Sequence, residues 1–286
     1  MEVVRKSEEI KAWVRKQKAS GKKVSLVPTM GALHAGHLSL VSIAKAHSDA
    51  VILYIFVNPA QFNDPKDLEK YPRTLERDLE LARGENVDVV FAPEAADIYP
   101  EGGGKLSGTC HVRAGNRSEN FEGDGRPGHF DGVCTVLNIM FNIVEADTAV
   151  FGEKDYQQLQ VVSQMVKDLQ IPIEIIPAPL VRDHDGLALS SRNVRLSPEG
   201  RKESLVISRT LAAAAEKVSS GERDARKLEQ NAIQAVESTG RVKVEYASIV
   251  DADSLEPLSH IDKPCQFLLT ATVEGIRLLD NIRLKP

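Results

Sequence analysis

The chain has 286 residues, of which 42% are hydrophobic and 27% are charged. This length can bury a full core and exceeds what one typical domain needs, so we expect two domains. The net charge of −5 and the pI near 5.9 disfavour a nucleic-acid-binding protein, in which basic residues are in excess. The longest apolar run, residues 50–57, is too short to cross a membrane.

The three cysteines of the chain, Cys110, Cys134 and Cys265, are an odd number and lack the spacing of a metal site. Such cysteines are typical of free thiols in a reducing compartment. The N-terminus alternates acidic and basic residues and lacks the apolar core of a signal peptide. We therefore expect a cytoplasmic protein that contacts neither a membrane nor a nucleic acid.

Strand-like apolar segments alternate with segments of helical period over residues 1–178. Ser7 is a candidate cap for a first helix, which we expect to end at Gly21. Strands are then predicted over 24–27, 51–57, 87–92, 148–151 and 173–177, and helices over 38–47, 74–82, 133–143 and 156–169. Apolar strands separated by helices predict an α/β, Rossmann-like fold, in which helices cover both faces of a parallel sheet.

Residues 99–126 depart from this pattern, because they are rich in glycine and polar residues, and we expect a long irregular loop there. Long loops in compact domains are often functional lids. Residues 102–105 do not form a P-loop, since Leu106 stands where that motif needs Ser or Thr. No G-x-G-x-x-G follows a predicted strand, so P-loop ATPases and dinucleotide dehydrogenases both fit poorly.

The composition changes near residues 177–182. Beyond this point the pattern predicts helices over 199–218 and 225–238, and then strands over 242–250, 265–273 and 276–279. Glu274 and Gly275 are typical of a tight hairpin turn between the last two strands. We therefore expect a first domain over residues 1–178 and a smaller α+β domain with antiparallel strands over 179–286.

Residues 28–37 (PTMGALHAGH), which we call the histidine turn, lie between the first apolar strand and the helix after it. Ligands of a parallel α/β sheet bind beyond the carboxyl ends of its strands. Free N–H groups at the helix N-terminus attract anions, Gly36 lets a phosphate approach closely, and His34 and His37 add donors. The alternative is that one imidazole caps or packs and the other is solvated.

Two further clusters follow predicted strands. In FVNPAQF, Asn58 and Gln61 offer neutral donors and acceptors for a hydroxyl or carboxylate, although an Asn-Pro turn with a surface glutamine explains the pattern equally well. In FGEKDYQQL, Gly152 permits close approach of a nucleotide, and Lys154 offers a positive charge for phosphate. Asp155 either accepts from ribose hydroxyls or stabilises the helix N-terminus.

A last cluster, DGLALSSRN, lies at the expected domain junction. Ser190 and Ser191 supply short donors and Arg192 supplies a bidentate fork, which together are typical of a phosphate clamp. Arg126, in RPGHF, has a structural explanation that is as good as a phosphate contact.

The histidine turn carries an H-x-G-H pattern, which resembles the signature of the class I nucleotidyltransferase superfamily. Together with FVNPAQF, RPGHF, FGEKDYQQL and DGLALSSRN, it makes the chain resemble the pantoate–β-alanine ligase family over residues 27–196, and less closely beyond. The residues that this resemblance assigns to ATP binding are Met30, Gly31, Ala32, Leu33, His34, Ala35, Gly36, His37, Gly152, Glu153, Lys154, Asp155, Val181, Leu189, Ser190, Ser191 and Arg192.

The catalytic residues that the resemblance implies are His37, His34 and Lys154, with His37 as the proton donor. It also implies that Gln61 and Gln158 bind pantoate and that Gln61 borders β-alanine, and we expect Asn58 to be a further substrate-binding residue. In the implied reaction, the carboxylate of pantoate attacks the α-phosphorus of ATP and pyrophosphate leaves. The amine of β-alanine then displaces AMP from the adenylate. Mg²⁺ is expected with the triphosphate, and no protein residue is assigned to it. The family also suggests a homodimer.

Two rival functions remain open at this point. Another class I nucleotidyltransferase would share the histidine turn but would not need the pair Gln61 and Gln158. A nucleotide sensor or RNA-contacting protein without turnover is disfavoured by the acidic balance and by the intact histidines and lysine.

Overall fold

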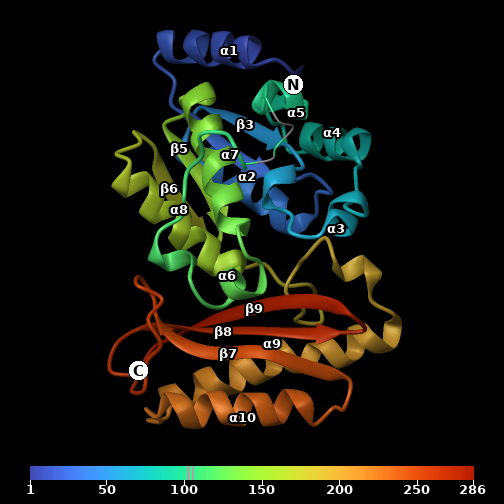
Figure 1. Cartoon of the computed structure of the whole chain (residues 1–286), viewed down its shortest axis with the longest axis vertical. Helices are drawn as coiled ribbons and strands as arrows, with labels where there is room; N and C mark the ends of the chain where they lie inside the picture. The colour runs from blue at the N-terminus through green and yellow to red at the C-terminus, as the bar shows by residue number, and fades with distance from the viewer. Residues whose placement is uncertain (102–103, 105) are drawn as a thin grey trace. The chain divides into compact units, whose positions relative to one another are not determined.

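The structure is a computed structural model, which describes residues 1–101, 104 and 106–286 (Figure 1). The rejected P-loop segment, 102–105, lies largely outside the described residues. The chain divides into two compact units. The N-terminal unit consists of residues 1–153 and 157–178, and the C-terminal unit of residues 154–156 and 179–286. Lys154–Tyr156, which we expected in the first domain, therefore group with the C-terminal unit.

A six-stranded parallel sheet forms the centre of the N-terminal unit, in the order β1-β4-β3-β2-β5-β6. Its strands are β1 (Glu2–Val4), β2 (Val24–Thr29), β3 (Ala50–Ile55), β4 (Val89–Phe91), β5 (Thr148–Gly152) and β6 (Glu174–Ala178). The predicted parallel α/β fold is confirmed. The sequence pattern misses β1, because three largely exposed residues form no apolar run and become a strand only by pairing with β4.

Helices cover both faces of this sheet. The helices over residues 1–178 are α1 (Ser7–Ala19), α2 (Ala35–His47), α3 (Pro65–Glu69), α4 (Leu75–Gly84), α5 (Ala95–Ile98), α6 (Glu122–Gly125), α7 (His129–Val144) and α8 (Tyr156–Asp168), with short 3₁₀ turns η1 (Pro59–Gln61), η2 (Asn116–Ser118) and η3 (Glu153–Asp155). Buried side chains of α1, α7 and α8 share one core with the sheet, and those of α2 and α4 share the other. In β2, Leu26 belongs to the first core and Val27 to the second, as the pleat requires.

The expected cap of α1 is wrong. Lys6 occupies the N-cap position, and the carboxylate of Glu9 accepts hydrogen bonds from the backbone N–H groups of Arg5 and Lys6, both at 3.2 Å. Ser7 is the first helical residue, and its hydroxyl has no partner among the residues that the structure describes. Glu9 thus replaces Ser7, because its longer side chain reaches back to the open donors at the helix start.

The irregular segment expected over 99–126 contains only short helical turns where it is described. Gln157, which is buried in α8, anchors part of it. Its amide nitrogen lies within 3.0–3.2 Å of the carbonyl oxygens of Arg117, Glu119 and Asn120, and its amide oxygen accepts from the backbone N–H of Glu122 at 3.0 Å. One buried side chain therefore supplies the hydrogen bonds that regular secondary structure would otherwise provide.

The C-terminal unit contains a three-stranded antiparallel sheet in the order β7-β8-β9 (Figure 1). Its elements are η4 (Asn193–Arg195), α9 (Pro198–Ser219), α10 (Ala225–Glu237), β7 (Val242–Asp251), β8 (Cys265–Val273) and β9 (Ile276–Leu284). Buried residues of α9 and α10 share one core with alternate residues of the strands. Glu274 and Gly275 both take positive φ angles, 52° and 76°, and form the predicted hairpin turn.

No helix in the described part of the chain is long and apolar enough to span a membrane. Cys110, Cys134 and Cys265 are free thiols in the structure, as expected.

Candidate active site

The histidine turn begins where β2 ends, at the carboxyl edge of the parallel sheet. Gly31 has a φ angle of 80°, and Ala32 takes a left-handed conformation with a φ angle of 49°, which non-glycine residues adopt only at a cost. The hydroxyl of Thr29 accepts from the backbone N–H of Gly31 at 3.2 Å and donates to the carbonyl oxygen of Tyr54 at 2.9 Å. The turn is therefore bent sharply and held by its neighbours in the sheet.

Asp78 of α4 holds the same turn from the other side. Its side chain is buried, with 1% of its surface exposed, and its carboxylate accepts from the backbone N–H groups of Ala32 at 2.9 Å and Leu33 at 2.8 Å. The hydroxyl of Thr74 donates to the same carboxylate at 3.2 Å. Sequence reasoning missed Asp78, although an acidic residue on the apolar face of an amphipathic helix, between Leu75 and Leu79, was a usable signal.

These hydrogen bonds correct one expectation about the histidine turn. We expected free backbone N–H groups to attract an anion, but Ala32 and Leu33 donate to Asp78, and Gly36 donates to His34 Nδ1 at 3.1 Å. The backbone N–H of His37 donates to the carbonyl oxygen of His34 at 2.8 Å. If an anion binds at this turn, its contacts must therefore come more from side chains than from these amides.

His34 and His37 lie together at the start of α2. His34 is the N-cap, α2 begins at Ala35, and the two ring centroids are 4.1 Å apart. Because His34 Nδ1 accepts from Gly36, the proton of a neutral His34 ring lies on Nε2. Both rings are half-buried.

Asn58 is hydrogen-bonded to the side chain of Gln61 and belongs to a buried hydrogen-bond network. Its Nδ2 donates to Gln61 Oε1 and to the carbonyl oxygen of Gly132, both at 3.1 Å. Its Oδ1 accepts from the backbone N–H of Ala60 at 3.2 Å and from the hydroxyl of Tyr99 at 2.7 Å. Burial raises the pKa of Tyr99, so this hydroxyl stays protonated and remains a donor. Asn58 is 1% exposed, and these bonds occupy both its donor and its acceptor groups.

The network orients the amide of Gln61. Since Gln61 Oε1 accepts from Asn58, its Nε2 points away from Asn58 and lies 2.9 Å from Met30 Sδ of the histidine turn. The backbone carbonyl oxygen of Gln61, as distinct from its side-chain amide, accepts from His129 Nδ1 at 2.8 Å and from the guanidinium of Arg126 at 3.4 Å. Gln61 thus presents a donor beside Met30, and Arg126 has a structural contact with the same segment.

The remaining predicted residues of the N-terminal unit lie at β5 and α8. Gly152 ends β5, and a Cβ atom there would meet only Leu40 at the ordinary distance of 3.8 Å. The local packing therefore does not explain this glycine. Glu153 and Gln158 are both half-buried.

Lys154 and Asp155 lie in the part of the chain that groups with the C-terminal unit. Lys154 Nζ is 3.3 Å from Asp155 Oδ1, and the side chain of Lys154 is 20% exposed. The carbonyl oxygen of Lys154 accepts from Asn281 Nδ2 at 2.9 Å, and the hydroxyl of Tyr156 donates to the carbonyl oxygen of Ala252 at 2.9 Å. This short segment is therefore fixed to β9 and to the end of β7.

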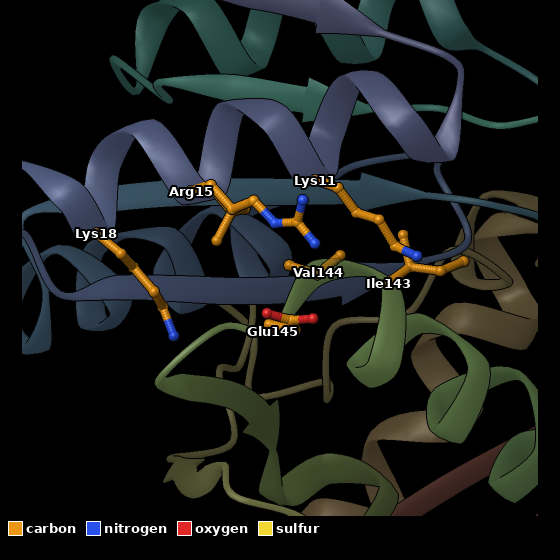
Figure 2. A pocket seen from close by; sticks show the side chains of 7 residues that line it. Lys11, Arg15, Lys18, Ile143, Val144 and Glu145 are labelled. Atoms are coloured by element: carbon orange, nitrogen blue, oxygen red, sulfur yellow. The ribbon is translucent and has the colours of Figure 1, made fainter.

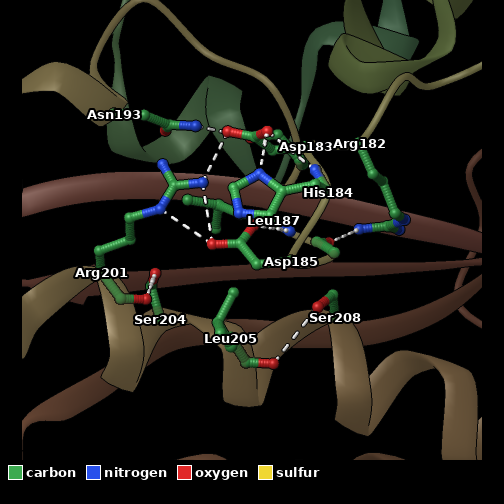
Figure 3. Close-up of polar contacts among 12 residues, drawn as sticks. Arg182, Asp183, His184, Asp185, Leu187, Asn193, Arg201, Ser204, Leu205 and Ser208 are labelled. Atoms are coloured by element: carbon green, nitrogen blue, oxygen red, sulfur yellow. Dashed lines mark hydrogen bonds and ion pairs between the residues drawn. The ribbon is translucent and has the colours of Figure 1, made fainter.

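Residues 181–192, which we call the clamp segment, fold back on themselves in the C-terminal unit (Figure 3). The backbone N–H of Leu189 donates to the carbonyl oxygen of Val181 at 3.0 Å, so these two predicted ATP-binding residues are neighbours. The hydroxyl of Ser190 accepts from the backbone N–H of Arg192 at 3.2 Å, and its proton remains to donate to a ligand. Ser190, Ser191 and Arg192 are all half-buried.

Three residues of the clamp segment have the spacing of metal ligands. Candidate ligand atoms of Asp183, His184 and Asp185 lie within 4.8 Å of one another. However, the guanidinium of Arg201 pairs with Asp183 at 2.6 Å and with Asp185 at 2.9 Å, as Figure 3 shows. Because Arg201 already forms ion pairs with both carboxylates, we assign no metal ion to this cluster.

A pocket elsewhere in the N-terminal unit is not part of this site (Figure 2). Its lining comes from α1 and from the end of α7, and includes Lys11, Arg15 and Glu145. The end of α1 leads into β2, and Glu145 precedes β5, so the pocket lies at the amino edge of the sheet. The histidine turn lies at the opposite, carboxyl edge, where parallel α/β sheets bind ligands.

Comparison with known proteins finds relatives along the whole chain. Residues 2–283 match the family model described as pantoate-β-alanine ligase. A pantothenate synthetase of Aquifex aeolicus is 44% identical over 282 residues, which cover 98% of each chain. A pantothenate synthetase of Thermoanaerobacter sp. strain X514 is 46% identical over 282 residues, which cover 99% of this chain and 98% of the relative.

Solved structures agree with these matches. The crystal structure of a pantothenate synthetase from Thermus thermophilus has a TM-score of 0.92 at 40% identity, with 100% of both chains covered. A pantoate-β-alanine ligase from Francisella tularensis, described as complexed with β,γ-ATP and β-alanine, has a TM-score of 0.81 at 32% identity. The match covers 99% of this chain and 97% of that one.

Proposed function

From the premise that the chain belongs to the pantoate–β-alanine ligase family, we propose that it forms pantothenate through a pantoyl-adenylate intermediate. Family membership makes the chain an ATP-dependent ligase that joins pantoate to β-alanine, as its motifs imply. The similarity over residues 2–283 carries this conclusion, because it includes all five motifs and both units.

Adenylation solves the chemical problem of this condensation. A carboxylate resists attack by an amine, because oxide is a poor leaving group. In the first step, a carboxylate oxygen of pantoate bonds to the α-phosphorus of ATP, and the bond to the bridging oxygen breaks to release pyrophosphate. In the second step, the nitrogen of β-alanine bonds to the acyl carbon, AMP leaves with the C–O electrons, and the amine loses a proton.

We assign the acid to the oriented side chains of the N-terminal unit. Gln61 presents an N–H donor whose direction Asn58 sets, and such a donor suits a carboxylate or hydroxyl oxygen. Gln158 is the second pantoate-binding residue of the proposal. Asn58 then supports binding through Gln61, since both its donor and its acceptor groups already bond within the protein.

We assign the phosphates to cationic and hydroxyl side chains. In the N-terminal unit, His34 supports the phosphates and His37 donates a proton to the departing pyrophosphate. In the C-terminal unit, Lys154, the two serines at 190–191 and Arg192 stabilise negative charge on the triphosphate. Fixed donors of this kind lower the barrier without covalent chemistry by the protein.

The remaining finer assignments are also proposals. Met30–His37, Gly152–Asp155, Val181 and Leu189 complete the ATP site. Mg²⁺ would accompany the triphosphate and help to balance its charge, and no residue of this chain is assigned to it, because this ion usually keeps several of its waters. We further propose that the protein works as a homodimer in the cytoplasm.

Isotope transfer tests the intermediate directly. The protein is mixed with ATP, Mg²⁺, β-alanine and pantoate that carries ¹⁸O in its carboxylate, and each component is omitted in turn. We expect AMP, pyrophosphate and pantothenate, with one ¹⁸O atom transferred to AMP. Formation of ADP, or unlabelled AMP, would contradict adenylation. AMP transfer to a nucleotide or pantetheine phosphate instead would favour the rival nucleotidyltransferase.

A further inference from the structure

Two adjacent polar residues of β9, Asp280 and Asn281, are buried in the C-terminal unit, with 5% and 6% of their surfaces exposed. Successive side chains of a strand point to opposite faces of the sheet. The side chains of Asp280 and Asn281 therefore contact two different segments of the chain. Burial of polar groups is costly unless they are hydrogen-bonded, so their partners indicate what the pair does.

Asp280 holds the clamp segment through Arg182. The guanidinium of Arg182 donates to both carboxylate oxygens of Asp280, at 2.7 and 2.8 Å, in a bidentate pair. The same guanidinium donates to the carbonyl oxygen of Gly186 at 3.2 Å. Because Gly186 lies at the turn of the segment, Arg182 connects both the base and the tip of the clamp segment to β9.

Asn281 holds Lys154. Its Nδ2 donates to the carbonyl oxygen of Lys154 at 2.9 Å, and its Oδ1 accepts from Gln266 Nε2 at 2.6 Å. Gln266 is buried on β8 and thus fixes the amide of Asn281 with its donor toward Lys154. The backbone N–H of Asn281 also donates to Asp280 Oδ1 at 2.7 Å, which couples the two anchors.

We propose that Asp280 and Asn281 are positioning residues, which hold Lys154 and the clamp segment in one arrangement for the triphosphate. This inference rests on the proposed function, because it assumes that these two segments bind phosphate. Neither residue needs to touch a substrate. The pair gives the last strand of the chain a role in ATP binding, although β9 lies far in sequence from every motif that points to the activity.

The alternative is that the pair only stabilises the fold. A double-mutant cycle separates the two roles, because residues that act through one another show non-additive effects. We expect Asn281→Ala to raise the KM for ATP about 3- to 10-fold, the usual effect of one lost hydrogen bond. We expect the KM for pantoate to be unchanged. In a Lys154→Ala background, Asn281→Ala should have no further effect on ATP.

Two further variants test the same role if Asn281→Ala folds poorly. Gln266→Leu leaves Asn281 in place but releases its amide, so it should change the KM for ATP in the same direction by a smaller factor. Asp280→Asn should also raise the KM for ATP, since Arg182 loses its charged partner. Thr270→Val is the matched control, because it replaces another buried polar residue of β8. We expect this variant to alter the melting temperature without altering either KM.

Three outcomes would overturn the inference: equal changes in both KM values, an effect of Thr270→Val on the KM for ATP as large as that of Asn281→Ala, or additive effects of Lys154→Ala and Asn281→Ala. The wild-type protein is measured in the same series. If the wild type forms no pantothenate, the proposed function fails. If the wild type is active and the variants keep its KM for ATP, only the positioning role fails.

Discussion

The histidine turn and the clamp segment are held by different physical means. In the N-terminal unit, one buried carboxylate, that of Asp78, accepts from two backbone N–H groups and holds a turn in which Ala32 is left-handed. In the C-terminal unit, an ion pair between the partly exposed Arg182 and the buried Asp280 holds a hairpin in which the positive φ angle belongs to a glycine, Gly186. A strained turn needs a stronger support than a relaxed one, so the histidine turn should tolerate substitution less well.

The largest effects are expected at two residues that we propose to bind the phosphates, one in the histidine turn and one, Lys154, that is anchored to the same strand as the clamp segment. His37→Ala and Lys154→Ala should each lower the rate of adenylate formation about 10²- to 10³-fold, the usual cost of removing a donor that stabilises the transition state. The folds should remain intact. Pyrophosphate release in a single turnover is the measurement, and His47→Ala and Lys167→Ala are matched surface controls. A near-normal rate in either variant would remove that residue from the mechanism.

Asp78→Asn tests the support of the histidine turn. Asparagine keeps one acceptor oxygen but turns an NH₂ group toward one of the two backbone donors. One buried N–H then lacks an acceptor, which costs about 1–3 kcal/mol. We expect a lower melting temperature and turnover reduced about 10- to 100-fold, since the turn that carries His34 is loosened.

Asp88→Asn provides the matched control for Asp78. Asp88 also accepts from a backbone N–H, that of Val51 at 2.8 Å, but at the amino end of β3. The Asp88→Asn variant should have a lower melting temperature than the wild type but a turnover close to that of the wild type. Wild-type turnover in Asp78→Asn would mean that the turn does not need its carboxylate.

Gln158→Ala tests whether acid binding and phosphate binding are separate. We expect the KM for pantoate to rise about tenfold, because one hydrogen bond to a charged carboxylate is lost, and the KM for ATP to change little. Gln164→Ala, on the same helix, should leave both values unchanged. Equal changes in the two KM values would place Gln158 outside the acid site.

A matched pair of glycines sharpens the comparison of the two regions. A Cβ atom on Gly31 would lie 3.0 Å from Asp78 Oδ2, whereas one on Gly186 would lie 3.5 Å from Ser208 Oγ. Both substitutions place an alanine in a left-handed conformation, which costs about 1–2 kcal/mol. Gly31→Ala also creates a close contact with Asp78, whereas Gly186→Ala does not. Denaturant unfolding should show the larger loss for Gly31→Ala. The reverse order would contradict our account of the two supports.

The smallest effect concerns acid stability of the clamp segment. Hydrogen bonds from the ring and backbone of His184, and then from Arg201, lower the pKa of Asp183 from 3.8 to about 2. A carboxylate with a lowered pKa stabilises the fold fully above 3.8, and this contribution is lost as the pH falls through about 2. The difference in unfolding free energy between wild type and Asp183→Asn should therefore shrink over that range. A difference that does not change with pH would contradict the ion pair.

Local patterns in the sequence predicted most regular elements, and the misses have physical reasons. Val242–Asp251 begins with alternating apolar and polar residues and Cys265–Val273 is largely apolar, so the residues of these long strands indicate them without help from a partner. The edge strand Glu2–Val4 depends on its partner. The start of α2 at Ala35, three residues before the predicted start, depends on the ring of His34, which caps the helix.

The residues of the candidate site likewise fall into those that the sequence predicted and those that only the structure revealed. Motif residues such as His37, Lys154 and Arg192 could be read directly, because glycine turns and charged side chains after strands have a local chemical meaning. Asp78, Tyr99 and Asn281 could not, since each acts only through hydrogen bonds to segments far away in the chain. Nothing in their own neighbourhood distinguishes them from ordinary helix and strand residues, apart from the apolar surroundings of Asp78.

The sequence by itself determined the α/β class, the family and the groups available for chemistry, because hydrophobic period and motif spacing are properties of neighbouring residues. The tertiary structure alone decided which backbone donors of the histidine turn are already used and which way the amide of Gln61 points. It also decided that Lys154 is anchored to the last strand. Hydrogen bonds join atoms that are close in space, and only folding sets those distances.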